Sequence, residues 1–326
     1  MEQQAKKIWI FDSTLRDGAQ GEEISFSVQD KLNIVQTLDQ LGIDYIEAGN
    51  PGSNPKDLEF FERVGQLTLH HAKLVAFGST RRKEEKVEDD INLQALLSAN
   101  TKAVSIFGKS WDFHVTDIIH TTLEENLRMI EETVAFLKAH GKEVIFDAEH
   151  FFDGYKRNPD YAMQTLLAAQ KGGADYICLC ETNGGAFPDE VSRIVAQVLP
   201  QLRVPVGIHT HDDGGMAVAS SVMAVLAGAQ MVQGTLIGFG ERCGNANLSA
   251  IIANLQLKRN YQCIPPENLH KLMQTCRVVS EISNVRLHKN MPYVGKSAFA
   301  HKGGMHIDGV NKAPASFEHI NPESVG

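Results

Sequence analysis

The chain has 326 residues, a formal net charge of −9 and 43% hydrophobic residues. This composition predicts a globular fold with a sizeable core, and the negative charge argues against nucleic acid or a membrane surface as partner. No apolar run approaches the roughly 18 residues of a membrane span, and the N-terminal residues lack a secretory signal. The five cysteines show no CxxC spacing, which favours a reducing compartment. We therefore expect a cytoplasmic protein with no nucleic-acid and no membrane partner.

Short β-rich runs alternate with amphipathic helical stretches along most of the chain. Residues 27–42 show the helical spacing, with Ser27 as the expected N-cap and Gly42 as the stop. Eight strand-then-helix units in about 250 residues predict a (β/α)8 TIM barrel over residues 1–260, rather than an open doubly wound sheet. The strand-like runs cover residues 8–15, 45–49, 73–78, 103–108, 143–150, 176–182, 206–212 and 231–240.

The alternation stops after residue 260. Residues 265–287 have the pattern of one helix, and the following segment is rich in Gly, Pro, His and Lys. Residues 261–326 are therefore expected to form a linker helix and a small helical or irregular subdomain. Such a segment cannot build a core of its own, so it must pack on the barrel or on another subunit.

Polar residues gather where the expected strands end. In TIM barrels the functional groups lie at the carboxyl ends of the strands, so these side chains are expected to meet at one mouth. The stretch FDSTLRDGAQGE delivers an arginine and an aspartate after the first strand, and later strands end in carboxylates, a threonine and histidines. These residues are Arg16, Asp17, Glu47, Asn50, Asp147, Glu149, Thr182, His209 and His211.

The segment GIHTHDD carries the sharpest local signal. His209 and His211 are two positions apart on a strand, so both imidazoles face the same side. With Asp17 from the first strand they predict a divalent-metal site, to which Asn245 could add an oxygen. Two imidazoles with oxygen ligands suit Mg²⁺, Mn²⁺, Zn²⁺ or Co²⁺. The positions left open would let an oxygen-rich substrate chelate the ion.

Four motifs resemble the signatures of a known family: FDSTLRDGAQ, LCETNGG, HTHDD and GERCGN. They look like those of the acetyl-CoA-dependent 2-oxoacid synthases, which include 2-isopropylmalate, homocitrate and citramalate synthases on a TIM barrel. The segments GSNPKD, FGKSWDFHV, DAEHFFDGYK and KSAFAHKGGMHIDGV look most like the citramalate synthase branch. Ala19 and Glu181 depart from the usual family residues, and neither is a proposed ligand.

The resemblance implies a Claisen-type condensation of acetyl-CoA with a 2-oxoacid, most simply pyruvate, giving citramalate and free CoA. Arg16 would stabilise the enolate or the developing oxyanion, and Gln20 would brace the arginine or a metal-bound water. Thr182 would bind the oxoacid carboxylate, with Asp147 also placed in the substrate site. Glu149 and His306 are the candidates for acid and base, and the order in which they act stays open.

The same resemblance implies a homodimer with exchanged C-terminal segments, in which His306 reaches the partner's barrel. It also implies an amino-acid-sensing domain that this sequence does not contain. The alternatives are a 2-isopropylmalate synthase acting on 2-oxoisovalerate, a homocitrate synthase, or a metal-dependent carbon–carbon lyase. A non-catalytic metal- or ligand-binding protein is a fourth alternative, but it would be expected to have lost Arg16 or a ligand.

Overall fold

The computed structural model describes residues 5–326, and its centre is a closed parallel barrel. Each strand pairs with the next, and β2 also pairs with β9, which closes the barrel. All eight predicted strands are present, although the first and the last end earlier than predicted because the chain turns after Asp12 and Gly234. The strands are β2 (Trp9–Asp12), β3 (Tyr45–Glu47), β4 (Lys73–Ser79), β5 (Ala103–Lys109), β6 (Glu143–Glu149), β7 (Tyr176–Glu181), β8 (Val206–Thr210) and β9 (Met231–Gly234).

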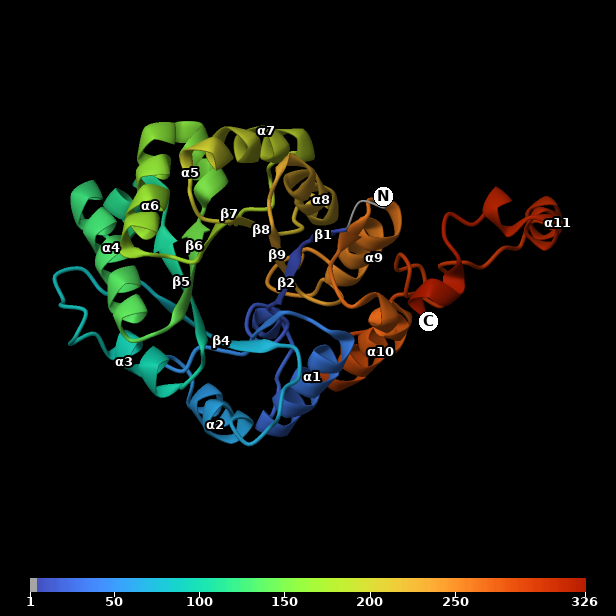
Figure 1. The fold of residues 1–326 in the computed structure, drawn as a ribbon, viewed down its shortest axis with the longest axis horizontal. Helices are drawn as coiled ribbons and strands as arrows, with labels where there is room; N and C mark the ends of the chain where they lie inside the picture. The colour runs from blue at the N-terminus through green and yellow to red at the C-terminus, as the bar shows by residue number, and fades with distance from the viewer. Residues whose placement is uncertain (1–4) are drawn as a thin grey trace.

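Helices surround the barrel, as Figure 1 shows. Helix α1 has the predicted caps: Ser27 makes a capping box with Asp30, and Gly42 ends the helix at φ +96°. None of the helices in residues 5–326 is both long and apolar enough to cross a membrane. The surrounding helices are α1 (Val28–Leu41), α2 (Pro55–Val64), α3 (Ile91–Ser98), α4 (Leu123–Ala139), α5 (Phe151–Arg157), α6 (Pro159–Gly172), α7 (Pro188–Val198), α8 (Ala217–Ala227) and α9 (Leu248–Lys258).

The barrel interior changes from apolar to polar toward the carboxyl ends of its strands. An apolar cluster inside the barrel is built from Phe11, Tyr45, Val75, Ala103, Ile145, Cys178, Cys180 and Met231. Two positions further along their strands lie polar side chains such as Glu47, Ser105, Asp147 and Gln233, all buried. Since alternate residues of a strand face the same side, the same period of two that fills the core also supplies the polar mouth.

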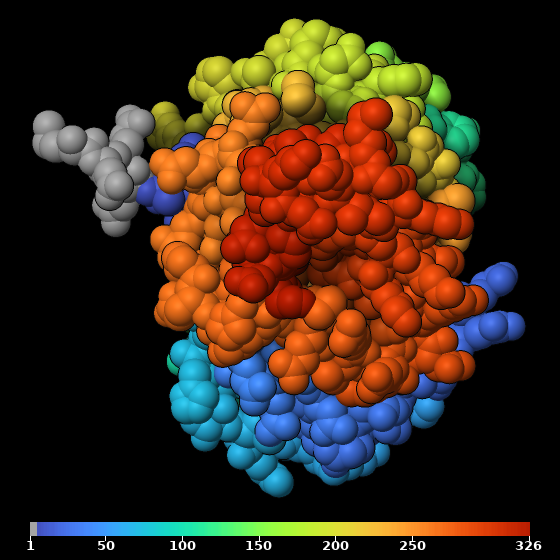
Figure 2. Space-filling view, turned by 90° about the vertical axis from the view of Figure 1, so that its right-hand side faces the viewer, coloured from blue at the N-terminus to red at the C-terminus, as the bar shows by residue number. Residues whose placement is uncertain are grey.

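The chain continues beyond the barrel along the outside of the molecule. Strand β10 (Tyr261–Gln262) pairs with β1 (Lys6–Lys7). The predicted helix over 265–287 is two pieces, a 3₁₀ segment at Pro266–Lys271 and then α10 (Leu272–Ser283), which packs against α1. The tail extends to α11 (Gly304–Lys312), which projects away from the barrel in Figure 1, and then returns to a 3₁₀ segment at Pro322–Val325 near the barrel. Figure 2 views the molecule from that side, with the red C-terminal residues in front of the orange ones.

Candidate active site

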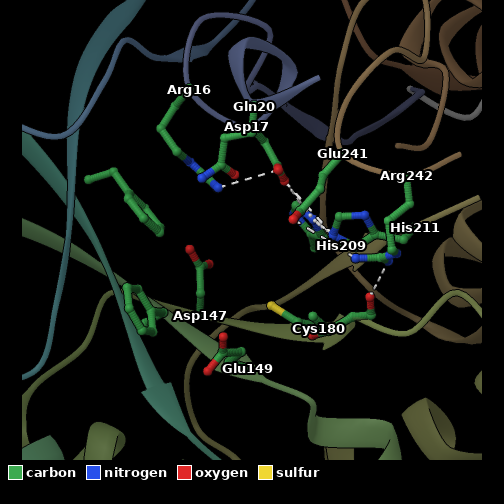
Figure 3. Close-up of a pocket in the computed structure, with 13 residues that line it drawn as sticks. Arg16, Asp17, Gln20, Asp147, Glu149, Cys180, His209, His211, Glu241 and Arg242 are labelled. Carbon is green, nitrogen blue, oxygen red and sulfur yellow. Dashed lines mark hydrogen bonds and ion pairs between the residues drawn. The ribbon is translucent and has the colours of Figure 1, made fainter. Parts of the chain in front are cut away.

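The mouth of the barrel brings together the three predicted metal ligands. Nε2 of His209 lies 3.2 Å from Oδ2 of Asp17 and 3.2 Å from Nε2 of His211. The Nε2 atom of His211 lies 4.0 Å from the same carboxylate oxygen. All three side chains are buried, and in Figure 3 they converge on one point. Two imidazole nitrogens and a carboxylate at these separations form a set of donors that fits one divalent ion.

Gln233 fixes the orientation of the first imidazole. Nδ1–H of His209 donates to Oε1 of Gln233 at 3.0 Å, and Nε2–H of Gln233 donates to Asp147 at 2.8 Å. Because the proton then sits on Nδ1, the lone pair of Nε2 faces Asp17, which is the usual arrangement of a metal-binding histidine. Burial alone would lower the pKa of His209, but the adjacent Asp17 carboxylate raises it, because that carboxylate accepts a hydrogen bond from Nε2 only when the imidazole is protonated. Burial and the neighbouring His209 lower the pKa of His211 to about 4.

Two further atoms at this point are buried without a partner. Oδ1 of Asn245 and Nδ1 of His211 have no hydrogen-bond partner among residues 5–326. The two residues lie opposite each other in an isolated antiparallel bridge, so the eighth loop holds Asn245 next to the histidines. A Cβ at Gly240 would lie 2.1 Å from Nδ2 of Asn245, so a larger residue there would displace the Asn245 amide. An unpaired buried amide oxygen is costly unless a ligand satisfies it, which agrees with the predicted fourth donor.

Arg16 lies beside the cluster and is held from three sides. Its Nε donates to Oε2 of Glu47 at 2.7 Å, and its Nη1 is 3.5 Å from Oδ1 of Asp17. Its guanidinium lies 3.8 Å over the ring of Phe77. Burial alone would raise the pKa of Asp17, but the charge of Arg16 and the contact with His209 hold it well below its usual range. The pair predicted from the opening motif is therefore a fixed cation next to a fixed anion.

The opposite wall of the mouth carries the remaining predicted side chains. Asp147 accepts hydrogen bonds from Ser105 and Gln233, and burial followed by the charge of Glu47 raises the pKa of Asp147 to about 6. Glu149 is paired with Lys109. Thr182 accepts a hydrogen bond from the backbone N–H of His150 at 2.9 Å through its hydroxyl. Figure 3 shows Asp147 and Glu149 across the cavity from Asp17, His209 and His211.

The cavity at the mouth measures about 250 Å³ and is open to solvent on one side. Gln20 lines this space with a largely exposed side chain. Sequence reasoning missed two aromatic residues of the lining, Phe77 and Phe107, whose rings stack at 5.4 Å. A phenylalanine inside a predicted strand signals a core position, and only closure of the barrel shows that these two rings face a cavity. The full lining is Arg16, Asp17, Gln20, Phe77, Phe107, Asp147, Glu149, Cys180, Thr182, His209, His211, Glu241 and Arg242.

His306 is the predicted residue that the single chain does not bring to the mouth. It lies on α11, where its ring stacks on Phe317 at 4.4 Å, and it is not among the residues that line the cavity. The helix that carries it projects away from the barrel (Figure 1).

Asp147, Cys178 and Cys180 form a second group with ligand-like spacing. Burial raises the pKa of the Cys178 thiol well above its ordinary value, and the pKa of Cys180 is raised as well. Neutral thiols are poor metal ligands, and both cysteines belong to the apolar cluster inside the barrel. Cys178 is a core side chain below the site, and Cys180 lies at the top of that core, where it also lines the cavity.

The barrel, the cluster at its mouth and the tail place the protein in a known class. The model of the HMGL-like family matches residues 7–279, so the chain belongs to that family. A second model, described as the homocitrate synthase post-HMGL domain-like region, matches residues 293–326. A solved structure, the HMG-CoA lyase of Bacillus subtilis, shares the fold with a TM-score of 0.72 at 19% identity, covering 89% of this chain and 98% of its own.

Within the family the chain is most similar, among the relatives compared, to proteins of the citramalate synthase branch. It is 57% identical to the (R)-citramalate synthase of Aquifex aeolicus (strain VF5) over 99% of this chain. It is 36% identical to the probable 2-isopropylmalate synthase of Methanopyrus kandleri over 98% of this chain. The predicted branch is thereby confirmed. The chain spans 61% of the length of each of these two relatives.

Proposed function

We propose that this chain forms the catalytic part of a citramalate synthase, which condenses acetyl-CoA with pyruvate to give citramalate and free CoA. The observation that carries the proposal is the convergence of Asp17, His209 and His211 beside Arg16 in one buried mouth. The similarity to an (R)-citramalate synthase at 57% identity supports the choice of reaction within the family.

Asp17, His209 and His211 would hold a divalent ion, with Asn245 as a further oxygen donor. A divalent ion bound there supplies Lewis acidity, which polarises the keto group of a chelating 2-oxoacid. Gln233 keeps His209 in the ligating tautomer, and Arg16 compensates the charge of Asp17 on its other side.

The side chains around this point would stabilise developing charge and bind the oxoacid. Arg16, fixed by Glu47, presents a permanent cation to the oxygen on which negative charge develops. The Thr182 hydroxyl lines the cavity and would donate to the carboxylate of the oxoacid. Asp147 bounds the substrate space, and its pKa near 6 leaves a share of the carboxyl protonated, so that it repels an anionic substrate less than a fixed charge would.

Glu149 and His306 would share the proton transfers of the condensation. Glu149 lines the cavity of its own chain, and its ion pair with Lys109 aims the carboxylate. His306 would come from the partner in a homodimer with exchanged C-terminal segments. The exposure of Met305 (81%) and Ile307 (43%) on the same helix supports this assembly, because a partner surface would bury both. We propose residues 1–260 as the catalytic barrel and 261–326 as the linker and exchanged subdomain.

The aromatic wall favours a small oxoacid. Phe77 and Phe107 stack against each other and line one side of the mouth, where they would limit the size of a bound oxoacid. A methyl group, as in pyruvate, fits beside two phenyl rings with less displacement than the isopropyl group of 2-oxoisovalerate.

The test is release of thiol from acetyl-CoA with pyruvate, 2-oxoisovalerate, 2-oxoglutarate or no oxoacid, each with and without EDTA. We expect release with pyruvate, much less with the larger oxoacids, and none after metal removal. Preferential release with 2-oxoisovalerate would reassign the chain to the 2-isopropylmalate reaction. Absence of release with every oxoacid would reject the synthase proposal.

A further inference from the structure

A chain of hydrogen bonds joins the loops that follow β7, β8 and β9 at the catalytic mouth. Its centre is Arg242, in the loop after β9. Nε and Nη2 of Arg242 donate to the two carboxylate oxygens of Asp213, in the loop after β8, both at 2.8 Å. Nη2 also donates to the backbone carbonyl of Thr182, directly after β7, at 2.7 Å. One guanidinium therefore holds three successive loops of the mouth together.

The backbone around Arg242 and Asp213 is shaped to permit these contacts. Arg242 has a φ of +57°, a left-handed conformation that costs free energy in a residue other than glycine. Gly184 leaves room for Asp213, because a Cβ at Gly184 would lie 2.3 Å from Oδ2 of Asp213. Hydrogen bonds between a guanidinium and a carboxylate are among the stronger ones in proteins, so they can offset the strain at Arg242.

Thr182 is held at both of its polar groups. Its carbonyl accepts the hydrogen bond from Arg242, and its hydroxyl oxygen accepts one from the backbone N–H of His150, directly after β6, at 2.9 Å. A β-branched side chain has few χ1 rotamers, so the place of the hydroxyl follows the place of the backbone. The contact with His150 leaves the hydroxyl hydrogen available, and Thr182 lines the cavity. A ligand in the cavity therefore meets a donor whose position Arg242 helps to fix.

We propose that Arg242 is a positioning residue for the oxoacid, which acts by holding Thr182 where its hydroxyl meets the oxoacid carboxylate. This inference deepens the proposed function and rests on the role proposed there for Thr182. The competing explanation is a direct contact of Arg242 with the oxoacid, because Arg242 also lines the cavity (Figure 3). Asp213 separates the two explanations, since it binds Arg242 but is not among the residues that line this cavity.

The experiment measures binding of pyruvate and of 2-oxoisovalerate to the whole chain by titration calorimetry with Mg²⁺ present. Asp213→Asn keeps the size of the side chain and removes the charge that holds Arg242, whereas Thr182→Val removes the hydroxyl. We expect each variant to bind the oxoacid about tenfold more weakly, as for the loss of one hydrogen bond to a charged group. The double variant should also lose about tenfold rather than about a hundredfold, because both changes remove the same contact.

Turnover and two further variants test the same point. In turnover, the KM for pyruvate should rise by a similar factor in Asp213→Asn while the KM for acetyl-CoA does not change. Arg242→Lys keeps the charge but lacks the planar fork that reaches Asp213 and Thr182 together, so it should bind the oxoacid as weakly as Asp213→Asn does. Arg63→Asn is the matched control, since it breaks an exposed arginine pair on α2 and should bind the oxoacid normally.

Normal affinity of Asp213→Asn or Arg242→Lys, or an additive loss of about a hundredfold in the double variant, would overturn the positioning role. If Thr182→Val binds both oxoacids as the unaltered chain does, the role of Thr182 fails and the role of Arg242 fails with it. If the variants behave as expected but no oxoacid supports release of CoA, only the condensation reaction is rejected. If the unaltered chain binds neither oxoacid, both proposals fail.

Discussion

The mouth of the barrel and the C-terminal arm (residues 285–326) differ in how far their functional side chains are buried and held by neighbours. In the mouth, Arg16, Asp17 and His209 are largely buried, and each is held by at least two neighbours. On the arm, Met305 is 81% exposed, and the rings of His301 and Phe317 lie beside His306. A barrel can thus preorganise its ligands within one chain, whereas the arm offers apolar side chains that remain to be covered.

The contrast also concerns ion pairs. Glu47 and Arg16 form a buried pair that a third group, Ser13, also contacts through its hydroxyl. Asp308 and Lys312 form an exposed pair on α11. Buried pairs are expensive to break because one charge is left uncompensated, while exposed pairs contribute little. The following predictions use this difference and run from the largest effect to the smallest.

Replacing both histidines of the mouth should have the largest effect. We expect His209→Ala/His211→Ala to lower pyruvate-dependent release of CoA by more than about 100-fold, since loss of even an outer-shell partner of a metal ligand can reach that factor. Bound metal measured by atomic emission should fall in parallel. The control His140→Ala alters an exposed imidazole at the end of α4 and should change neither quantity. Retention of metal by the double variant would contradict the ligand assignment.

Breaking the buried Arg16–Glu47 pair should have the second largest effect, a loss of stability. We expect Glu47→Gln to lower the free energy of unfolding by about 3 kcal/mol, because Arg16 keeps its charge and loses the nearer of its two anions, with only the longer contact to Asp17 left. Urea denaturation followed by circular dichroism measures the change. Glu59→Gln is the matched control, since the Glu59–Arg63 pair on α2 is exposed. Equal stability of the two variants would show that the mouth does not depend on this pair.

Substitutions on the arm should have the third largest effect, a weaker self-association of the chain. We expect Met305→Ser/Ile307→Ser to weaken self-association by about tenfold, because less apolar surface is buried against a partner. Sedimentation analysis over a range of concentrations measures this change, and the thermal stability of the barrel should not move. An unchanged association constant would argue that these two side chains of α11 lie outside the interface.

A mixing experiment sharpens the same comparison. Asp17→Ala and His306→Ala should each be nearly inactive alone. When equal amounts are mixed, unfolded and refolded together, half of the dimers contain one chain of each variant, and each of these dimers has one intact site of two. The mixture should therefore regain about a quarter of wild-type activity. No recovery in the mixture would mean that both residues act within one chain.

The smallest effect is expected for the exposed pair of the arm. Lys312→Ala removes the partner of Asp308 and should change the free energy of unfolding by no more than about 0.5 kcal/mol. The same urea titration measures it. A loss comparable to that of Glu47→Gln would show that the arm is braced as strongly as the mouth.

The sequence predicted the parts of this molecule that depend on local spacing. Alternation in GIHTHDD places His209 and His211 on one face, and the capping residues of α1 mark both of its ends. The role of Gln233 could not be predicted in this way. It contacts His209 on the neighbouring strand β8 and Asp147 on β6, which lies further around the barrel, so its position depends on closure of the whole sheet.

The aromatic wall could not be predicted for a related reason. Phe77 and Phe107 have the pattern of core residues until the pairing of β4 with β5 and the cavity above them are known. The role of His306 stays a prediction from the family resemblance, because His306 does not line the cavity of its own chain. Local patterns therefore predicted the ligands, and contacts distant in sequence determine what surrounds them.

The most direct test of the account is pyruvate-dependent release of CoA by the chain after removal of metal with EDTA and again after return of a divalent ion. The account predicts that release stops with EDTA, returns with the ion in the unaltered chain, and does not return in His209→Ala/His211→Ala. Undiminished release by the metal-free chain, or by the double variant, would contradict it.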